Sequence, residues 1–358
     1  MHPKKNIAFF TSGLLNYSGA ATQALKVAKS LDKYNVFFFN KENTAPRFFS
    51  KSILYEKFQV ITLQKFLPFR FITIIYFLLK FHVRTCHFHV FLIRNMVPCL
   101  LLGCRIILKT TLLSNDDFET QCGSKKKYFT RLILSKVSYN VVLTKNIQKI
   151  NQQYITPEKV KVIYNGIKIQ EMPAVKTENI FCYAGLVCPR KRTYNTILYF
   201  AEHYAHLPNA KLYIIGPYTT TVNLPEFSQQ YYDSCMDLID EFNIQSQVTF
   251  TGNIPIEEVF EIFQQAKALI FLSSKEGFPN TVLEAMSYNC VPIISHMDGV
   301  ADELIVDGVD GFVLEDENRN ITIEEIDRMS LSGEVYKKVN TYFTIQKTVE
   351  QLSELYEK

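Results

Sequence analysis

The sequence predicts an α/β fold of two Rossmann-like domains, each a largely parallel sheet covered by helices. Short runs of β-branched and aromatic residues alternate with longer amphipathic segments along the whole chain, which is the pattern of β-α-β units. A chain of 358 residues with 47% hydrophobic residues can form two domains, each with its own core. This composition excludes fibrous and disordered classes.

The strand candidates follow the same rhythm in both halves of the chain. In the first half they are residues 6–10, 35–39, 86–91, 105–110, 140–144 and 161–164. In the second half they are residues 179–185, 211–216, 247–252, 268–274, 291–295 and 311–314.

Two further segments define the expected domain limits. Residues 168–179 are polar, contain Pro173 and lack periodicity, so we expect a linker there. A single amphipathic helix is expected from about Ser332 to the end. The predicted domains are therefore 1–170 and 171–335, with a helix at 336–358. Because open α/β sheets bind ligands at the carboxyl ends of their strands, two facing domains would hold a ligand in a cleft between them.

The net charge of +4 conceals a strong asymmetry. Residues 1–172 contain 26 Lys/Arg against 8 Asp/Glu, whereas residues 173–358 contain 13 against 27. An anionic ligand or surface is therefore expected for the first half: nucleic acid, a phosphorylated substrate or acidic lipid. Two solvated surfaces of different composition are the alternative.

The segment from Phe66 to Arg84, FLPFRFITIIYFLLKFHVR, is apolar with basic residues at intervals. Its uncharged core, Phe71–Leu79, is far shorter than the roughly 20 residues of a membrane-spanning helix. It is either an interfacial helix on an anionic membrane or a helix buried in the domain core.

Several site classes find no support in the sequence. The eight cysteines form no C-x-x-C pair, so neither a zinc site nor a disulfide framework is suggested. No G-x-G pair, P-loop or Asp-x-Asp is present, which removes the dinucleotide and P-loop fingerprints and leaves a divalent-metal site with little support. The N-terminus reads as a first strand rather than a signal peptide, so a cytoplasmic protein is expected.

The most informative stretch is SSKEGFPNTVLEAMSYNCVPIIS, Ser273–Ser295. It predicts a loop, a helix at 281–289 and a strand, with Gly277 allowing close backbone approach and Asn280 as the N-cap. The free N–H groups at Asn280–Val282 would bind phosphate. Glu276 before the turn and Glu284 one helical turn in would accept paired hydroxyls. Together these groups predict a site for a sugar nucleotide.

The run EGFPNTVLEAM resembles the E-x7-E signature of the retaining GT-B glycosyltransferases of the "group 1" family. The similarity extends over Val248–Leu314, with weaker echoes in NYSGAATQALKVAKSL, VIYNGI and YAGLVCPRKR. It implies a GT-B fold of two facing Rossmann-like domains with a C-terminal helix crossing back to the first. It also implies retention of anomeric configuration without a metal or other cofactor.

The resemblance assigns roles to matched positions. Glu276 matches the glutamate at the donor sugar, Glu284 the one at the ribose, and Lys191 the lysine that neutralises the diphosphate. Glu276 and Lys191 are therefore the predicted catalytic residues, and Glu303 matches a further family acid. The donor-binding set is Gly19, Arg190, Lys191, Glu276, Gly277, Phe278, Pro279, Asn280, Thr281 and Glu284.

Two positions depart from the family pattern. Leu186 stands where an arginine usually follows the glycine of the basic loop, so Arg190 or Arg192 has to supply the second positive charge. Thr111 stands where the first domain often has a histidine. On this acceptor side, Asp116 and Asp117 either orient the acceptor hydroxyl or cap the next helix.

His87 and His89 alternate along a strand, so one of them is expected to face the core, and a structural role is the expectation for each.

The expected protein is a metal-independent retaining hexosyltransferase that uses a nucleoside-diphosphate sugar. The basic first half favours a lipid-linked glycan acceptor in cell-surface polysaccharide biosynthesis, with the protein peripheral on the inner face of the membrane. The alternatives are an epimerase of the same architecture and a non-catalytic accessory subunit. A nucleic-acid partner is not expected, because no recognised binding module is present.

Overall fold

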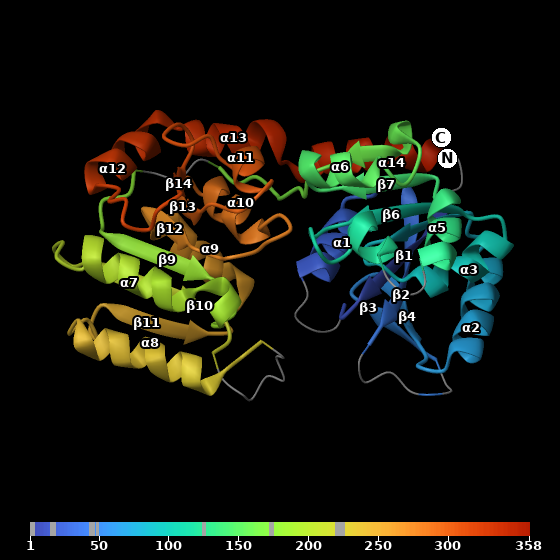
Figure 1. Ribbon diagram of the computed structural model, residues 1–358, viewed down its shortest axis with the longest axis horizontal. Helices are drawn as coiled ribbons and strands as arrows, with labels where there is room; N and C mark the ends of the chain where they lie inside the picture. The colour runs from blue at the N-terminus through green and yellow to red at the C-terminus, as the bar shows by residue number, and fades with distance from the viewer. Residues whose placement is uncertain are drawn as a thin grey trace. The chain divides into compact units, whose positions relative to one another are not determined.

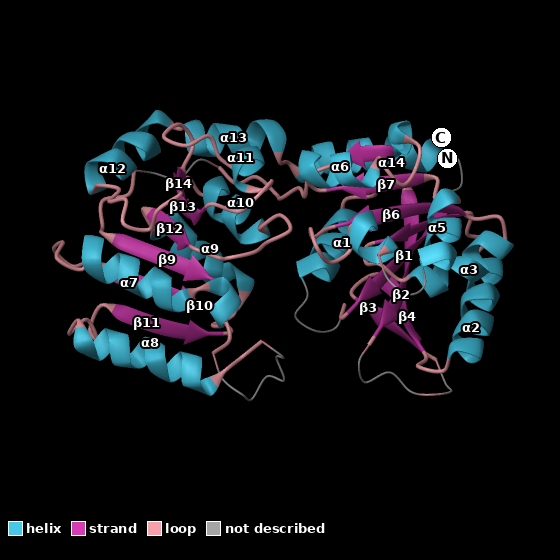
Figure 2. Ribbon diagram, viewed as in Figure 1, coloured by secondary structure: helices cyan, strands magenta, loops and turns pink. Residues whose placement is uncertain are grey.

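The computed structural model describes residues 4–14, 19–42, 47, 50–123, 127–171, 175–218 and 226–358. The chain divides into two compact units, shown in Figures 1 and 2. Unit 1 comprises Met1–Gly166 together with Ile345–Lys358, and unit 2 comprises Ile167–Thr344. The unit limits therefore differ from the expected 170/171 and 335/336 by a few residues at the first and by nine at the second.

Unit 1 contains an eight-stranded sheet of order β3-β4-β2-β1-β5-β6-β7-β8. The strands are β1 (Lys5–Ser12), β2 (Tyr34–Lys41), β3 (Lys51–Tyr55), β4 (Phe58–Leu63), β5 (Thr85–Phe88), β6 (Arg105–Thr110), β7 (Tyr139–Val142) and β8 (Val160–Val162). All pairs are parallel except the β3–β4 hairpin. Sequence reasoning missed this hairpin because its turn, Glu56-Lys57, contains none of the usual turn residues.

Helices cover both faces of this sheet (Figure 1). They are α1 (Gly19–Lys29), α2 (Leu67–Lys80), α3 (Ile93–Leu101), α4 (Phe118–Cys122), α5 (Lys127–Ser135), α6 (Lys145–Asn151) and α14 (Ile345–Glu357), with a 3₁₀ turn η1 (Pro157–Lys159). Strand β1 supplies both cores, because alternate side chains point to opposite faces. Ile7 and Phe9 pack with α1 and α14, whereas Ala8 and Phe10 pack with α2 and α3.

Unit 2 contains a six-stranded parallel sheet of order β11-β10-β9-β12-β13-β14. The strands are β9 (Ile180–Ala184), β10 (Lys211–Ile215), β11 (Val248–Gly252), β12 (Ala268–Phe271), β13 (Val291–Ser295) and β14 (Phe312–Leu314). Each of them lies within a predicted strand segment.

The helices of unit 2 define where the strand order reverses. They are α7 (Thr193–His203), α8 (Gln229–Glu241), α9 (Ile256–Gln265), α10 (Asn280–Ser287), α11 (Ala301–Leu304), α12 (Ile323–Ser332) and α13 (Glu334–Tyr342), with a 3₁₀ turn η2 (Pro189–Lys191). The chain runs outward from β9 through β10 to β11, then returns and runs outward from β12 in the opposite direction. The switch point therefore lies between β9 and β12, where open α/β sheets bind ligands.

The expected single C-terminal helix is wrong, because the segment forms two helices. Helix α13 belongs to unit 2 and α14 to unit 1, and the break lies at Phe343 and Thr344. There the carbonyl of Phe343 accepts the N–H of Ile167 at 2.9 Å. The Phe343 ring packs against Phe278, with centroids 5.5 Å apart. These contacts take the backbone out of the helix, so the segment that joins unit 1 begins at Ile345 rather than at 336.

The expected linker at 168–179 is in part an integral segment of unit 2. The Lys176 side chain is buried, and its ammonium donates to the carbonyls of Phe263 at 3.0 Å and Ala266 at 2.6 Å. Gln170 is held through its carbonyl by the hydroxyl of Tyr336 at 2.8 Å. Pro173 lies outside the described residues.

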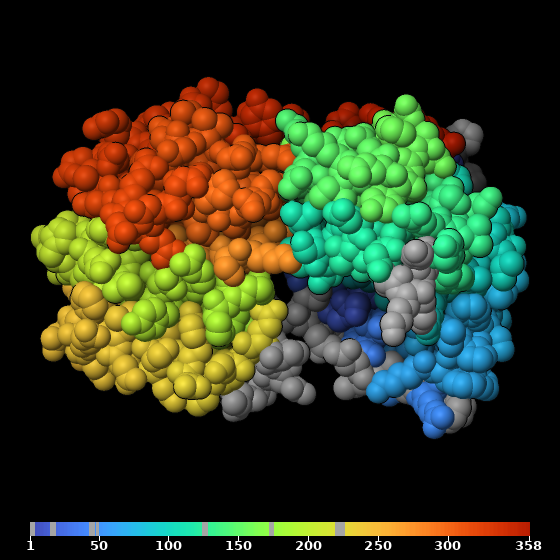
Figure 3. Space-filling model, viewed as in Figure 1, coloured from blue at the N-terminus to red at the C-terminus, as the bar shows by residue number. Residues whose placement is uncertain are grey.

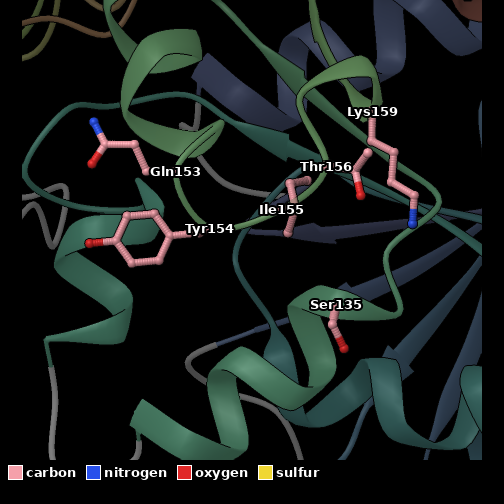
Figure 4. Close-up of a pocket in the computed structure, with 6 residues that line it drawn as sticks. All are labelled: Ser135, Gln153, Tyr154, Ile155, Thr156 and Lys159. Atoms are coloured by element: carbon pink, nitrogen blue, oxygen red, sulfur yellow. The ribbon is translucent and has the colours of Figure 1, made fainter.

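A shallow hollow of about 360 Å³ lies in unit 1, between the end of α5 and the segment from α6 to η1 (Figure 4). It is lined by Ser135, Gln153, Tyr154, Ile155, Thr156 and Lys159. None of the predicted site residues lines it. The ammonium of Lys159 donates a hydrogen bond to the carbonyl of Val137 at 3.2 Å.

Candidate functional site

The candidate site is built by the two loops that leave adjacent strands at the switch point of unit 2. One loop follows β9 and contains η2, and the other follows β12 and leads into α10. The carbonyl of Arg190 accepts the backbone N–H and the hydroxyl of Ser274, each at 2.9 Å. The end of β13 supports the second loop, because the hydroxyl of Ser295 donates to the carbonyl of Ser273 at 2.6 Å. The loops therefore form one connected structure.

At the centre of this structure lies the carboxylate of Glu276. Its Oε1 atom is 2.6 Å from the ammonium of Lys191 and 3.2 Å from a guanidinium nitrogen of Arg190. It also accepts the hydroxyl of Ser273 at 2.7 Å. All three donors converge on Oε1, and Oε2 has no hydrogen-bond partner among the described residues. The side chains of Glu276 and Lys191 are only 13% and 16% exposed, so their attraction is stronger than at an open surface.

Arg190 connects this carboxylate to a second acid that the sequence analysis did not identify. Its guanidinium contacts the Oε2 atom of Glu226 at 2.8 Å and 2.9 Å, and donates to the carbonyl of Lys275 at 3.0 Å. Burial by itself would lower the pKa of Arg190, but the hydrogen bond that Arg190 donates to Glu226 and the charge of Glu276 raise it. Arg190 is therefore a fixed positive charge beside Lys191.

Arg192, the other candidate for the second positive charge, faces a different acid. It occupies the left-handed region with φ of 52° at the start of α7, and its guanidinium pairs with Glu317. Leu186, in the arginine position of the family pattern, is buried. Of the two arginines, Arg190 is thus the one beside Glu276.

Helix α10 begins one residue earlier than predicted and ends before 289. Pro279 occupies the N-cap, and its carbonyl accepts the N–H of Val282 at 3.1 Å. The expectation of a free N–H group at Val282 is therefore wrong. Asn280, predicted as the cap, is instead the first helical residue, because the fixed φ of proline already provides the extended conformation that a cap requires. Asn289 has φ of 52°, which ends the helix.

The remaining donor-side residues lie along or near α10. Gly277, Asn280 and Thr281 are half-buried, whereas Phe278 and Pro279 are buried under the turn. Glu284 lies half-buried in the second turn of α10, about 6 Å further along the axis than Asn280. The pKa of the Tyr288 phenol is raised, mainly by burial and then by the charge of Glu284. Glu303 lies half-buried on α11.

Two glycines at the strand ends shape the backbone beside the site. Gly216 has φ of +131°, and a Cβ there would lie 2.2 Å from the carbonyl oxygen of Gly185. A Cβ on Gly185 would lie 2.9 Å from the hydroxyl of Tyr183. Only glycine fits this close approach of β9 to β10. The signal in the sequence was a glycine closing each of the segments 179–185, 211–216 and 247–252.

On the acceptor side, both predicted acids are engaged in local hydrogen bonds. Asp116 accepts the N–H of Leu112 at 2.7 Å and the N–H and hydroxyl of Thr111, each at 2.9 Å. Asp117 caps α4 by accepting the N–H of Thr120 at 2.9 Å, as one of the two interpretations expected. Burial raises the pKa of Asp116, and the hydrogen bonds from this loop oppose that rise. An orienting role toward an acceptor stays a prediction for all three residues.

Three further residues of unit 1 are placed as follows. Gly19 is the first residue of α1, where a Cβ would meet no atom within 4 Å, and the loop at 15–18 before it lies outside the described residues. His87 and His89 are both buried and stacked, with ring centroids 4.1 Å apart. His87 lies in β5 and His89 follows its end at Phe88. Both imidazoles belong to the core, so the expectation that one of them faces it is wrong.

Within the described residues, no three His, Cys, Asp or Glu side chains are grouped so that they could hold a metal ion. Over the same part of the chain, no helix has both the length and the apolar character to span a membrane.

Known structures of the same architecture cover almost the entire chain. Sucrose-phosphate synthase from Thermosynechococcus elongatus has a TM-score of 0.77 at 16% identity, covering 99% of this chain and 98% of that one. Anabaena HepE in complex with UDP has a TM-score of 0.73 at 15% identity, covering 99% of both chains. At such identities the similarity shows the fold alone, and that fold is GT-B.

Curated relatives give a similar result at the level of sequence. An uncharacterised glycosyltransferase of Methanocaldococcus jannaschii is 22% identical over 266 residues, which is 67% of this chain and 64% of the relative. The capsular polysaccharide biosynthesis glycosyltransferase CapH of Staphylococcus aureus is 22% identical over 248 residues, 64% of this chain and 63% of the relative. The matches thus span less than two thirds of these relatives.

The model of the glycosyl transferases group 1 family matches residues 166–344, half of the chain. This range coincides with unit 2 and includes both loops of the site. The chain therefore belongs to the glycosyl transferases group 1 family.

Proposed function

We propose that the protein is a retaining glycosyltransferase that moves a sugar from a nucleoside-diphosphate sugar to a hydroxyl of a lipid-linked glycan. The observation that carries this proposal is the convergence of Lys191 and Arg190 on Glu276 at the switch point of unit 2. Family membership supports the reaction class. The UDP complexes of HepE and the polysaccharide role in the name of CapH support the donor and acceptor classes.

The chemistry requires stabilisation of a departing nucleoside diphosphate. Lys191 and Arg190 supply two positive charges, and the N-terminus of α10 supplies the positive end of the helix dipole. Fixed charges of this kind stabilise negative charge that develops in the transition state. On this proposal, a diphosphate binds beside Lys191, and the positive charge of Lys191 then faces both the diphosphate and the carboxylate of Glu276.

The two glutamates would hold the hydroxyl groups of the donor. Oε1 of Glu276 is fixed by Ser273, Lys191 and Arg190, so Oε2 is the atom that a hydroxyl of the transferred sugar would reach. Glu284 would hold the ribose. The incoming acceptor hydroxyl would then be assisted by the leaving phosphate on the same face of the sugar, which retains the configuration.

The acceptor is proposed to be membrane-associated, at the cytoplasmic leaflet. The support is the excess of basic residues in the first half of the chain, with 26 Lys/Arg against 8 Asp/Glu in residues 1–172, which favours a phosphorylated acceptor or an acidic surface.

The proposal is tested by a thermal-shift screen against nucleotide sugars, followed by incubation of the stabilising donor with and without a lipid-linked acceptor. We expect a donor to raise the melting temperature, and a product with the anomeric configuration of the donor, formed also with a chelator present. Conversion of the sugar without any acceptor would indicate an epimerase instead. Binding without transfer to any acceptor would indicate an accessory subunit.

A further inference from the structure

Helix α2 has an exposed face that is almost entirely apolar. Ile72, Tyr76 and Leu79 are 63%, 54% and 57% exposed, and Phe69 is 44% exposed. These four residues are spaced by three, four and three positions, so they lie on one side of the helix, over about 15 Å of its length. The opposite side is anchored in the core by Ile74 and Leu78, which are buried. The helix is therefore apolar on both sides, unlike an ordinary surface helix.

Large apolar side chains are exposed on neighbouring helices as well. Helix α3 packs against both α2 and α5, and each of these neighbours adds large exposed apolar side chains. They are Leu101 at the end of α3 and Tyr128, Phe129 and Leu132 on α5. In Figure 3 the light-blue atoms of the α2 region lie at the outer surface of unit 1. A contiguous apolar face exposed on a folded protein usually marks an interaction site.

The charges around the face are of one sign. Between Glu56 and Asp116 the chain has no acidic residue and eight basic ones. Exposed basic side chains border the apolar face at Lys65, Lys80 and Arg84, and Arg94 is exposed on α3. The ammonium of Lys80 lies 5.7 Å from the ring centroid of Tyr76, at the edge of the apolar face.

We infer that the exposed face of α2, with the basic side chains around it, is a docking surface for an anionic lipid bilayer. The apolar side chains enter the boundary between headgroups and acyl chains, and the basic side chains contact the lipid phosphates. With 14 residues, α2 is too short to cross a bilayer, so it lies in the plane of the interface. The inference names the contact surface for the membrane-associated acceptor of the proposed function and rests on that proposal for its purpose.

The composition of this surface favours an anionic bilayer over a second copy of the chain or a nucleic acid. A second copy of the chain related by two-fold symmetry would bring one basic face against another, which is repulsive. A nucleic acid would match the charge, but it gains little from aliphatic side chains such as Ile72 and Leu79, which have no flat ring for a base to stack on. An anionic bilayer satisfies both the apolar and the basic part of the surface.

The test uses the full chain and flotation with vesicles of phosphatidylcholine alone or mixed with phosphatidylglycerol, at low and high salt. We expect the wild-type protein to float with the mixed vesicles more than with phosphatidylcholine alone, because phosphatidylglycerol is anionic. It should float less at high salt, because exposed charges are screened beyond about 10 Å at 0.1 M salt. Ile72→Ser/Leu79→Ser should weaken binding at least about tenfold at both salt concentrations, since each lost side chain removes apolar burial in the interface. Lys80→Ser/Arg84→Ser should weaken binding at low salt only.

Leu331→Ser is the matched control, because Leu331 on α12 of unit 2 is 65% exposed and lies outside this surface; it should float like the wild type. The inference is overturned if Ile72→Ser/Leu79→Ser floats like the wild type, or if the wild type floats with neither vesicle. It is also overturned if the variant abolishes a dimer seen by sedimentation or the binding of an oligonucleotide instead of lipid. The donor-induced thermal shift should be unchanged in the variant, so failure of docking and failure of the proposed reaction give different results.

Discussion

Unit 1 and unit 2 carry opposite charge and use their ionisable side chains differently. Unit 1 contains 27 Lys/Arg and 10 Asp/Glu, and unit 2 contains 12 and 25. In acidic unit 2, basic Lys191 and Arg190 gather around one carboxylate at the switch point. In basic unit 1, the predicted acids Asp116 and Asp117 are buried in local hydrogen bonds, while basic residues border the exposed face of α2. Net charge therefore does not locate the site, because the cluster of basic side chains around Glu276 lies in the acidic unit.

The largest expected effect is a loss of stability in unit 1, with unit 2 unaffected. Deleting residues 345–358 removes the buried Ile345, Leu352, Leu355 and Tyr356 from its core. At about 1.5–3 kcal/mol for each buried side chain, the loss is about 6 kcal/mol or more. Hydrogen exchange should show loss of protection in β1 and β5, with the strands of unit 2 unaffected.

Point variants on α14 test the same contacts in the full-length chain, so that aggregation of a truncated chain does not determine the result. Leu352→Ala should destabilise unit 1 by about 2–5 kcal/mol, and Gln351→Ala, on the exposed side of the same helix, should have little effect. Wild-type protection of β1 after deletion or after Leu352→Ala would show that α14 is dispensable for unit 1.

The second effect concerns unit 2 and changes activity rather than folding. Lys191→Ala and Glu276→Ala should each lower sugar transfer by about 10²–10³-fold, the usual loss when a group that stabilises transition-state charge is removed. Lys275→Ala is the control, because it removes the same charge as Lys191→Ala in the loop that contains Glu276. Circular dichroism should be unchanged in all three. Near-normal turnover in either site variant would refute the assignment.

The third effect is a pH dependence specific to unit 1. Burial, and then the charge of Lys109, lowers the pKa of His87 well below 6.5, and burial likewise lowers that of His89. In the unfolded chain both imidazoles bind protons near pH 6.5, so below that pH the unfolded state holds more protons than the folded one. The free energy of unfolding should therefore fall as pH falls below 6.5, by up to about 1.4 kcal/mol per pH unit for each imidazole.

Urea unfolding at pH 7.5, 6.5 and 5.5, monitored through exchange in β5, measures this slope. His87→Asn/His89→Asn should reduce it, and His206→Gln, at an exposed position of unit 2, should not. An unchanged slope in the double variant would show that these imidazoles do not control the acid sensitivity of unit 1.

The smallest effect distinguishes the two arginines of the β9 loop. Arg190→Gln should lower transfer about tenfold, because hydrogen bonds to charged groups are each worth about 1.5–3 kcal/mol. Arg192→Gln should change it much less, since Arg192 pairs with Glu317 instead. The initial rate at saturating and limiting donor decides between them. Equal losses, or a larger loss for Arg192→Gln, would show that Arg190 is not the residue that supplies the second positive charge.

The sequence by itself determined the features that depend on near neighbours. Short runs of β-branched and aromatic residues predicted all six strands of unit 2, because the preference of these residues for strands is local. Turn chemistry placed the loop before α10, since glycine and proline restrict the backbone wherever they occur. The family motifs belong to the same level, because their residues are close together in the chain. The hairpin β3–β4 escaped because its turn carries no such residue.

Only the tertiary structure decided which distant groups meet. Lys191 and Glu276 pair because the sheet order puts β9 beside β12, and nothing in their separate segments encodes that neighbourhood. The choice of Arg190 over Arg192, the inward turn of Asp116 and the helix break at Phe343 likewise depend on contacts with remote residues. The same holds for the exposed side of α2, which is as apolar as its buried side. Where a helix is apolar all round, only packing decides which side faces solvent.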